Sequence, residues 1–129
     1  MSRRSAAARE AWVHDAALDA VVAAPGHHRL LLENDRVRVL HTRVGPGEKV
    51  PLHTHRWPAV YHVKSWSDFV RRNAAGEVMV DTRTASGVAD MPPVVWLAPL
   101  EPHTLENVGD RDIDLVSIEV KEPEDGFDA

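Results

Sequence analysis

The chain has 129 residues, of which 43% are hydrophobic and 27% are charged, and its formal net charge is −5. This length is typical of one domain, which buries roughly two-thirds of the surface that its unfolded chain exposes. The negative charge argues against nucleic acid as a partner, because phosphate binding depends on clustered Lys and Arg. Cysteine is absent, which excludes disulfides, thiolate nucleophiles and cysteine-ligated zinc.

The beginning of the chain, MSRRSAAARE, contains an arginine pair that could suggest an export signal. It is followed by Glu10, His14, Asp15 and Asp19, so the apolar segment that such a signal needs is missing. The longest wholly apolar run, residues 20–24, is far below the roughly 18 residues of a membrane span. We therefore expect a cytoplasmic protein with no membrane partner.

Residues 1–26 are predicted to form an N-terminal helical extension. Its apolar positions have helical spacing: Val13, Ala16, Ala17, Ala20, Val21 and Ala24. Ser5 is a candidate N-cap, and Pro25 with Gly26 would end the helix. The apolar face is mostly alanine, so we expect this helix to pack against a larger body.

After Gly26 the chain predicts only strands. They cover residues 30–32, 37–39, 50–55, 59–64, 68–72, 77–83, 94–97 (a buried strand) and 116–120, with a hairpin turn at 73–76 and a loop at 86–93. Many short strands separated by turn residues predict an all-β sandwich or barrel over residues 27–121. The last segment, 122–129, is predicted to be an acidic flexible tail.

Two histidines alternate in one of the predicted strands. Residues i and i+2 of a strand point to the same face with Cα atoms about 6.5 Å apart, so His53 and His55 project together. Two imidazoles placed in this way can bind one metal ion at about 2.0 to 2.1 Å each. The alternative is a pair of surface or hydrogen-bonded histidines.

A wider pattern surrounds this pair. Residues 47–55 read G-x5-H-x-H, and residues 103–107 read H-x3-N, preceded by Pro99 and followed by Gly109. Together these motifs resemble the cupin superfamily of small jelly-roll β-barrels, over about residues 30–121. The resemblance implies a cupin-like jelly-roll barrel or sandwich with a short N-terminal helix. It also implies one divalent transition metal (Fe, Zn, Ni, Cu or Mn) bound by His53, His55 and His103.

The chain departs from the family pattern at the motif glutamate, a usual metal ligand. Ala59 or Val60 stands at that position. Three neutral histidines remain a plausible ligand set, although the same loss could mark a cupin that no longer holds metal. Glu101 and Glu106 are the carboxylates nearest in sequence to His103, and either could replace the missing ligand.

The remaining histidines have less support as ligands. If residue 60 points inward, His62 also points inward, as an auxiliary ligand or a pocket residue. We expect ordinary surface or core roles for His14, His27, His28 and His41. The aromatic residues near the motifs are expected mainly in the core, with a pocket lining as the alternative: Trp57, Tyr61, Trp66, Phe69 and Trp96. Arg56 and Lys64 could steer an acidic substrate.

The resemblance implies a small metal-binding cupin that acts on or binds a small organic molecule in the barrel, with dioxygenase- or isomerase-type chemistry. Catalytic residues are not assigned by the sequence. The competing hypothesis is a non-catalytic ligand-binding or structural cupin dimer without a tightly bound metal, and the missing glutamate favours it. We expect a homodimer in which residues 5–33 contribute to the interface or brace the barrel.

Overall fold

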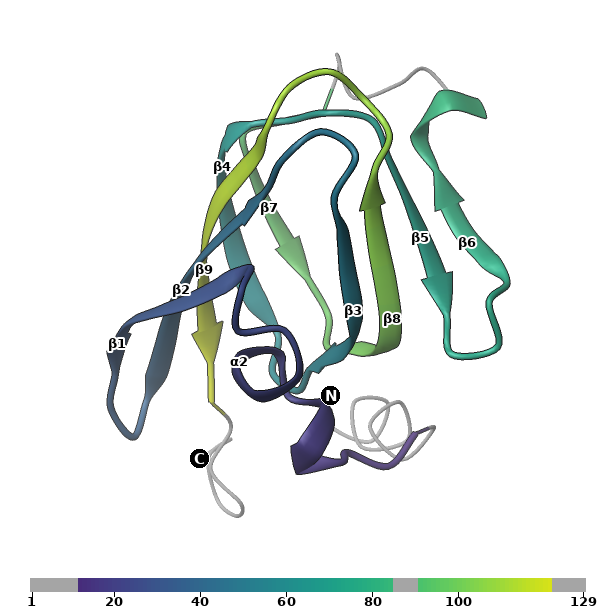
Figure 1. The fold of residues 1–129 in the computed structure, drawn as a ribbon. Coiled ribbons are helices and arrows are strands. Elements are labelled where there is room, and N and C mark those ends of the chain that lie inside the picture. Colours follow the sequence, from purple (N-terminus) through teal and green to yellow (C-terminus); the bar gives the residue numbers. More distant parts are fainter. Residues whose placement is uncertain (1–11, 85–90, 122–129) are drawn as a thin grey trace.

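Two antiparallel sheets face each other in the computed structural model, which describes residues 12–84 and 91–121 (Figure 1). One sheet has the strand order β1-β2-β9-β4-β7, and the other has the order β3-β8-β5-β6. The strands are β1 (His28–Glu33), β2 (Val37–Val44), β3 (Lys49–His55), β4 (Ala59–Ser65), β5 (Phe69–Asn73), β6 (Val78–Asp81), β7 (Val94–Leu97), β8 (Leu100–Asn107) and β9 (Ile113–Val120). The all-β fold predicted from the sequence is confirmed.

The core lies between the sheets because the central strands alternate buried and more exposed residues. In β9, Ile113, Leu115, Ser117 and Glu119 are buried, while the residues between them are not. This period of two is that of a strand with one face turned to a core. The buried apolar cluster comprises Ala24, Val44, Val50, Ala59, Tyr61, Val63, Phe69, Ile113 and Leu115.

The N-terminal segment differs from the single helix predicted from the sequence. Within the described residues it forms two short helices, η1 (Ala16–Leu18) and α2 (Ala20–Ala23). The carboxylates of Asp15 and Asp19 cap these helices by accepting backbone N–H groups, so each aspartate starts a new helix and interrupts a longer one. Ala20 and Ala24 are buried, and α2 lies at one end of the two sheets (Figure 1). The predicted cap Ser5 lies outside the described residues.

Two strands correct the sequence analysis. β8 was not predicted, because its sequence, LEPHTLEN, contains a proline and lacks a regular alternation of apolar residues. β7 was predicted to be buried, yet Val94 and Trp96 are 53% and 58% exposed, because they lie on the outer face of the sheet, opposite His62 and Val60. A third helix, η2 (Thr82–Thr84), follows β6. Most of the predicted loop at 86–93 and the predicted tail at 122–129 fall outside the described residues.

No helix in the described part of the chain has the length and apolar character needed to cross a membrane. The cytoplasmic location stays a prediction. The division into an extension at 1–26 and a barrel at 27–121 also stays a prediction.

Asn107, the last residue of the second histidine motif, connects β8 to β2 and to the loop before β9 through hydrogen bonds. Asn107 is fully buried, and its Nδ2 donates to the carbonyl oxygens of Val44 (2.9 Å) and Arg111 (2.8 Å). Its Oδ1 accepts the N–H of Gly109 at 3.0 Å. A Cβ at Gly109 would meet Ser67 Oγ and would lie 2.8 Å from the backbone nitrogen of Asp68. Glycine is therefore needed here for close packing.

Gly109→Ala should destabilise the fold by about 1 to 3 kcal/mol, because a backbone atom and not only a flexible side chain would have to move. The control is Gly26→Ala, since nothing lies within 4 Å of a Cβ at that position. Urea unfolding monitored by circular dichroism measures the free energy of unfolding of both variants. Equal stability of the two variants would contradict the close contact at Gly109.

Candidate metal centre

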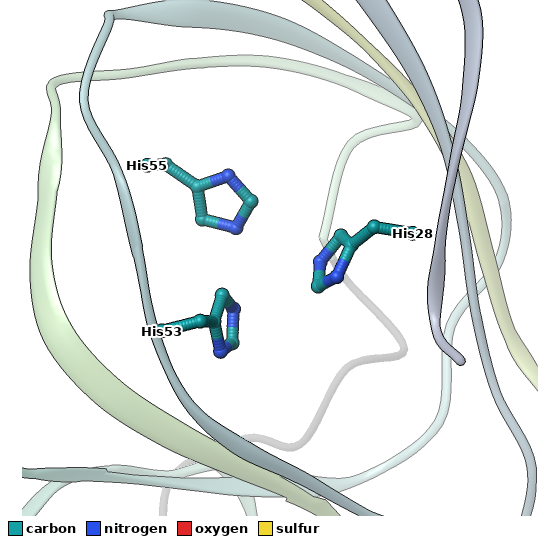
Figure 2. A group of neighbouring side chains, drawn as sticks. All are labelled: His28, His53 and His55. Atoms are coloured by element: carbon teal, nitrogen blue, oxygen red, sulfur yellow. The ribbon is translucent and has the colours of Figure 1, made fainter. Parts of the chain in front are cut away.

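Four buried histidines gather between the two sheets. His28 begins β1, His53 and His55 belong to β3, and His103 belongs to β8. They are between 2% and 6% exposed. One ring nitrogen from each of His28, His53 and His55 lies within 4.8 Å of the other two, and Figure 2 shows these three rings pointing toward one another.

His103 lies beside this trio. It is the direct partner of His53 in the β3–β8 register, and their ring centroids are 4.3 Å apart. The ring of His55 is 5.8 Å from that of His103. The three ligands predicted from the sequence therefore occupy one place, and the fold adds His28 to them.

The local shape of β3 aims its two histidines inward. The β3–β8 register shifts between Val50 and His53 and again between His53 and His55. Such irregularities bend a strand and re-aim its side chains. Thr54, between the two histidines, is also buried, and its Oγ1 donates to the carbonyl oxygen of Leu18 at 3.4 Å. The N-terminal segment thus packs on β3 at the histidines.

Every ring in the cluster has its Nδ1 next to an oxygen. The oxygen atoms are the carbonyls of Ala24 (3.1 Å, His28), Pro51 (2.7 Å, His53) and Glu101 (2.6 Å, His103), and Oε2 of Glu119 (3.3 Å, His55). A carbonyl oxygen can only accept, so Nδ1 must carry the proton in the three rings that face one. Nε2 then keeps its lone pair. A hydrogen bond from the ring nitrogen that does not bind the metal is the usual way in which a metal-binding histidine is oriented.

Burial keeps these rings neutral. It lowers the pKa of His28 and His55 to about 3 and that of His103 to about 2, with neighbouring imidazoles as the next cause. Burial also lowers the pKa of His53. The neutral ring is the form that binds a metal ion.

A buried carboxylate reaches the cluster from the last strand, which was predicted from the sequence, although its Glu119 was not predicted to belong to the site. Ala59, at one of the two possible positions of the motif glutamate, is buried and lies directly opposite Glu119 in the β4–β9 register. Glu119 is fully buried, and its Oε2 faces Nδ1 of His55. The fold therefore brings a carboxylate next to His55 from β9, where it accepts a hydrogen bond from the ring.

Glu119 is the middle of a chain of charged side chains. Arg38 Nε donates to Glu119 Oε1 at 2.6 Å, and its two terminal nitrogens donate to Asp19 at 2.9 and 3.0 Å. Burial raises the pKa of Glu119, although Arg38 opposes that change. Burial alone would also raise the pKa of Asp19, but the guanidinium of Arg38 outweighs it and lowers that pKa. The chain Asp19–Arg38–Glu119–His55 links the N-terminal segment to the histidine cluster.

Three expectations about the site are corrected. His62 is exposed on the outer face of β4, because the odd-numbered residues of that strand, and not residue 60, face inward. Glu101 is exposed and contributes only its carbonyl oxygen, while Glu106 pairs with Arg72. Sequence reasoning missed His28 and Glu119. No spacing signal identifies either, since each reaches the cluster through a contact between distant strands.

The aromatic residues are divided between core and surface. Tyr61 and Phe69 belong to the core, and Trp66 packs against it with its ring 6.0 Å from that of Phe69. Trp57 lies among the cations of Arg38, Arg56 and Lys121, whose charged groups are 5.0 to 5.2 Å from its ring centre. Arg56 therefore contacts Trp57.

The donor set fits a metal ion. Nitrogens bound to one ion at about 2.1 Å lie at most about 4.2 Å apart, which is close to the spacing within the trio. Neutral imidazoles with their Nδ1 engaged offer Nε2 as ligand atoms for Zn, Cu, Fe or Ni. His53 and His55 are common to the set predicted from the sequence and to the trio in the structure.

No protein-family model and no curated protein sequence matches the chain. Solved structures do match. A cupin domain from Bordetella pertussis Tohama I is similar over 74% of this chain and 92% of its own, with a TM-score of 0.54 and 20% identity. An RmlC-like cupin with a double-stranded β-helix fold from Methanocaldococcus jannaschii is similar over 75% of this chain and 81% of its own, with a TM-score of 0.51 and 11% identity. The two facing antiparallel sheets and these likenesses agree with the histidine motifs: the chain has the fold of the cupin superfamily.

Proposed function

We propose that this protein is a small metal-binding cupin that holds one divalent transition metal and binds a small organic molecule beside it in the barrel. His53, His55 and His103 are the proposed ligands, joined by His28. The observation that carries the proposal is the common arrangement of the four rings. Each is buried, and each has its Nδ1 beside an oxygen, which leaves Nε2 available.

Neutral ligands leave the charge of the ion uncompensated. A divalent metal in such a site acts as a Lewis acid toward a bound oxygen atom, and it supports dioxygenase- or isomerase-type chemistry when a coordination position is open. Glu119 would orient His55 and raise the basicity of its ring by accepting a hydrogen bond from Nδ1.

The second candidate function is a ligand-binding or structural protein without tightly bound metal. It is favoured by one observation, the alanine at residue 59.

We also propose that the protein is a homodimer that pairs through the outer face of the five-stranded sheet. The strand register places Leu32, Val39, Ile118, Val60 and Trp96 in one row across all five strands. Leu32, Ile118 and Trp96 are 51%, 38% and 58% exposed, which is unusual for large apolar side chains.

A second copy suits this face better than a smaller partner. Five strands about 4.8 Å apart make an apolar band roughly 20 Å wide, and Val94 extends it on the edge strand β7. A continuous apolar face of this kind can pair with itself about a two-fold axis. Leu32 falls within the segment that the sequence predicts at the interface.

Replacing any one of His28, His53, His55 and His103 by Ala should lower metal affinity by at least 10- to 100-fold, because loss of even a supporting contact costs that much. Inductively coupled plasma mass spectrometry after loading with Zn²⁺ or Ni²⁺ measures the metal content of each variant. The control is His62→Ala, on the outer face. Wild-type protein should melt at a lower temperature in EDTA, since an ion held 100-fold above its Kd adds about 2.7 kcal/mol. Full metal content in the His53→Ala variant would contradict the site.

The metal-free protein should lose stability as the pH falls below about 6.5. The buried rings have folded-state pKa values well below their unfolded value of 6.5, so the unfolded chain binds protons that the folded chain does not. Stability is complete above pH 6.5 and declines toward pH 3, by about 1.4 kcal/mol per pH unit for each ring. Urea unfolding in EDTA at pH 7, 6 and 5 measures the slope. A flat profile would mean that protons reach the rings in the folded protein.

Ile118→Asp should convert the dimer to a monomer, because it places a charge at the centre of the apolar row. Size-exclusion chromatography with light scattering at micromolar concentration measures the mass. Val78→Asp is the matched control, since Val78 is 55% exposed but lies on β6 of the other sheet. A monomeric wild type, or equal dissociation of both variants, would contradict this interface.

A further inference from the structure

Arg71 of β5 faces the interior beside the histidine cluster. In the β5–β8 register, Arg71 is opposite Leu105, and Asn73 is opposite His103. Residues two apart in a strand share a face, so Arg71 lies on the same inner face as the core residue Phe69. The side chain is half-buried. Arg71 is two residues from Asn73, the partner of His103.

Among the residues that the structure describes, no carboxylate pairs with Arg71. Arg38, Arg43, Arg72 and Arg83 each have an acidic partner, and the contrast with the next residue is direct, because Arg72 on the outer face pairs with Glu106. Burial lowers the pKa of Arg71, yet a guanidinium stays charged in proteins. A partly buried cation without an anion is costly unless a ligand supplies one.

Two buried residues with hydroxyl groups face the interior from the opposite sheet, and the hydroxyl of Ser117 lacks a partner in the described part of the chain. Tyr61 is 7% exposed and Ser117 is 1% exposed, and they lie directly across from one another on β4 and β9. Ser117 Oγ has no hydrogen-bond partner. Burial raises the pKa of Tyr61, so its hydroxyl keeps its proton as a donor. Buried polar groups in native proteins nearly always have a partner, which points to a ligand or water here.

The positive charge of Arg71 reaches both groups of residues. It contributes to the lowered pKa of His55 and of His103, and it interacts with Tyr61. The ring of Tyr61 lies 6.5 Å from that of His55, and Arg71 lies on the strand that pairs with the strand of His103, so both belong to the same interior region as the histidines.

We propose that this interior region binds a small organic carboxylate that carries a second oxygen donor: Arg71 pairs with the carboxylate, Tyr61 donates a hydrogen bond to it, and the second donor reaches the metal. The inference rests on the proposed function and names the substrate class of that site. It adds Arg71, Tyr61 and Ser117 as the residues that select the ligand.

The charges of the interior favour such an anion. Arg38 pairs with both Asp19 and Glu119, and the charge of Arg71 brings the sum of these four charges to zero, so the +2 charge of a bound ion would have no counterpart. One or two carboxylates on the ligand would neutralise it. The planar fork of a guanidinium matches a carboxylate in two parallel hydrogen bonds, which is the reason to infer a carboxylate at Arg71.

Isothermal titration calorimetry tests the proposal with three dicarboxylates of increasing length and their neutral diamides: oxalate, malonate and succinate against oxamide, malonamide and succinamide. Zn²⁺-loaded protein should bind at least one dicarboxylate, and the matching diamide should bind at least about 10-fold more weakly, because it lacks the charge. Absence of dicarboxylate binding, or equal binding of the diamide, would overturn the proposal.

The variants locate the binding. Arg71→Met should weaken dicarboxylate binding by about 10- to 100-fold, and Tyr61→Phe by about 3- to 10-fold. Arg72→Met removes the same charge from the outer face and should change dicarboxylate binding by less than about 2-fold, because the charge of Arg72 is paired with Glu106 and points away from the interior. If Arg71→Met does not fold by circular dichroism, Arg71→Lys replaces it, with an expected weakening of about 3- to 10-fold from the lost fork. Wild-type affinity in the folded Arg71 variant would overturn the assignment.

Zinc content, measured on the same samples, separates this inference from the proposed function. Arg71→Met should keep the zinc of wild type. If wild type binds no zinc, the metal centre fails, and the titrations are repeated on metal-free protein, where Arg71-dependent binding still supports the carboxylate site. If zinc binds but no dicarboxylate does, the metal centre stands and the carboxylate site is wrong.

Discussion

The side chain of Glu119 is completely removed from water, and the rest of the site depends on how that carboxylate is held. An ionised carboxylate without a partner costs several kcal/mol to bury even after the protein relaxes. Arg38 offsets this cost with a hydrogen bond of 2.6 Å from Nε. Removing one partner of a buried ion pair typically costs about 3 to 5 kcal/mol, because the other charge stays behind. The pair fixes β2 against β9 and leaves the second oxygen of Glu119 free to face His55.

The same guanidinium also determines where the N-terminal segment lies. Arg38 donates two hydrogen bonds to Asp19, and Asp19 is the N-cap of α2. Ala24 follows that helix, and its carbonyl oxygen accepts from Nδ1 of His28. One arginine on β2 thus supports two histidines, His55 through Glu119 and His28 through α2. The two rings come from different sheets and face each other, each held by its own support.

Much of the fold and three of the five residues of the site were predictable because their signals are local. β-Branched alternation predicts β9, and the resemblance of the two motifs to the cupin pattern groups His53, His55 and His103. His28 and Glu119 were not predictable, since each joins the cluster through strand pairing across the chain. The assignment of His62 to the interior failed by a single residue. The motif allows an inward side chain at 59 or 60. A shift of one position exchanges the inward-facing and outward-facing side chains of the whole strand. The structure has Ala59 inside, opposite Glu119.

β9 lies at the centre of its sheet, between β2 and β4, although it is the last strand in the sequence. During synthesis, β2 and β4 therefore leave the ribosome without the neighbour that pairs with both of them. Their unpaired edges are available to other chains until residues 113–120 emerge. Glu119 arrives with the same strand, so Arg38 has no buried carboxylate from β9 before then. The interior takes its final form late, and sequence-distant pairing of this kind makes folding slow.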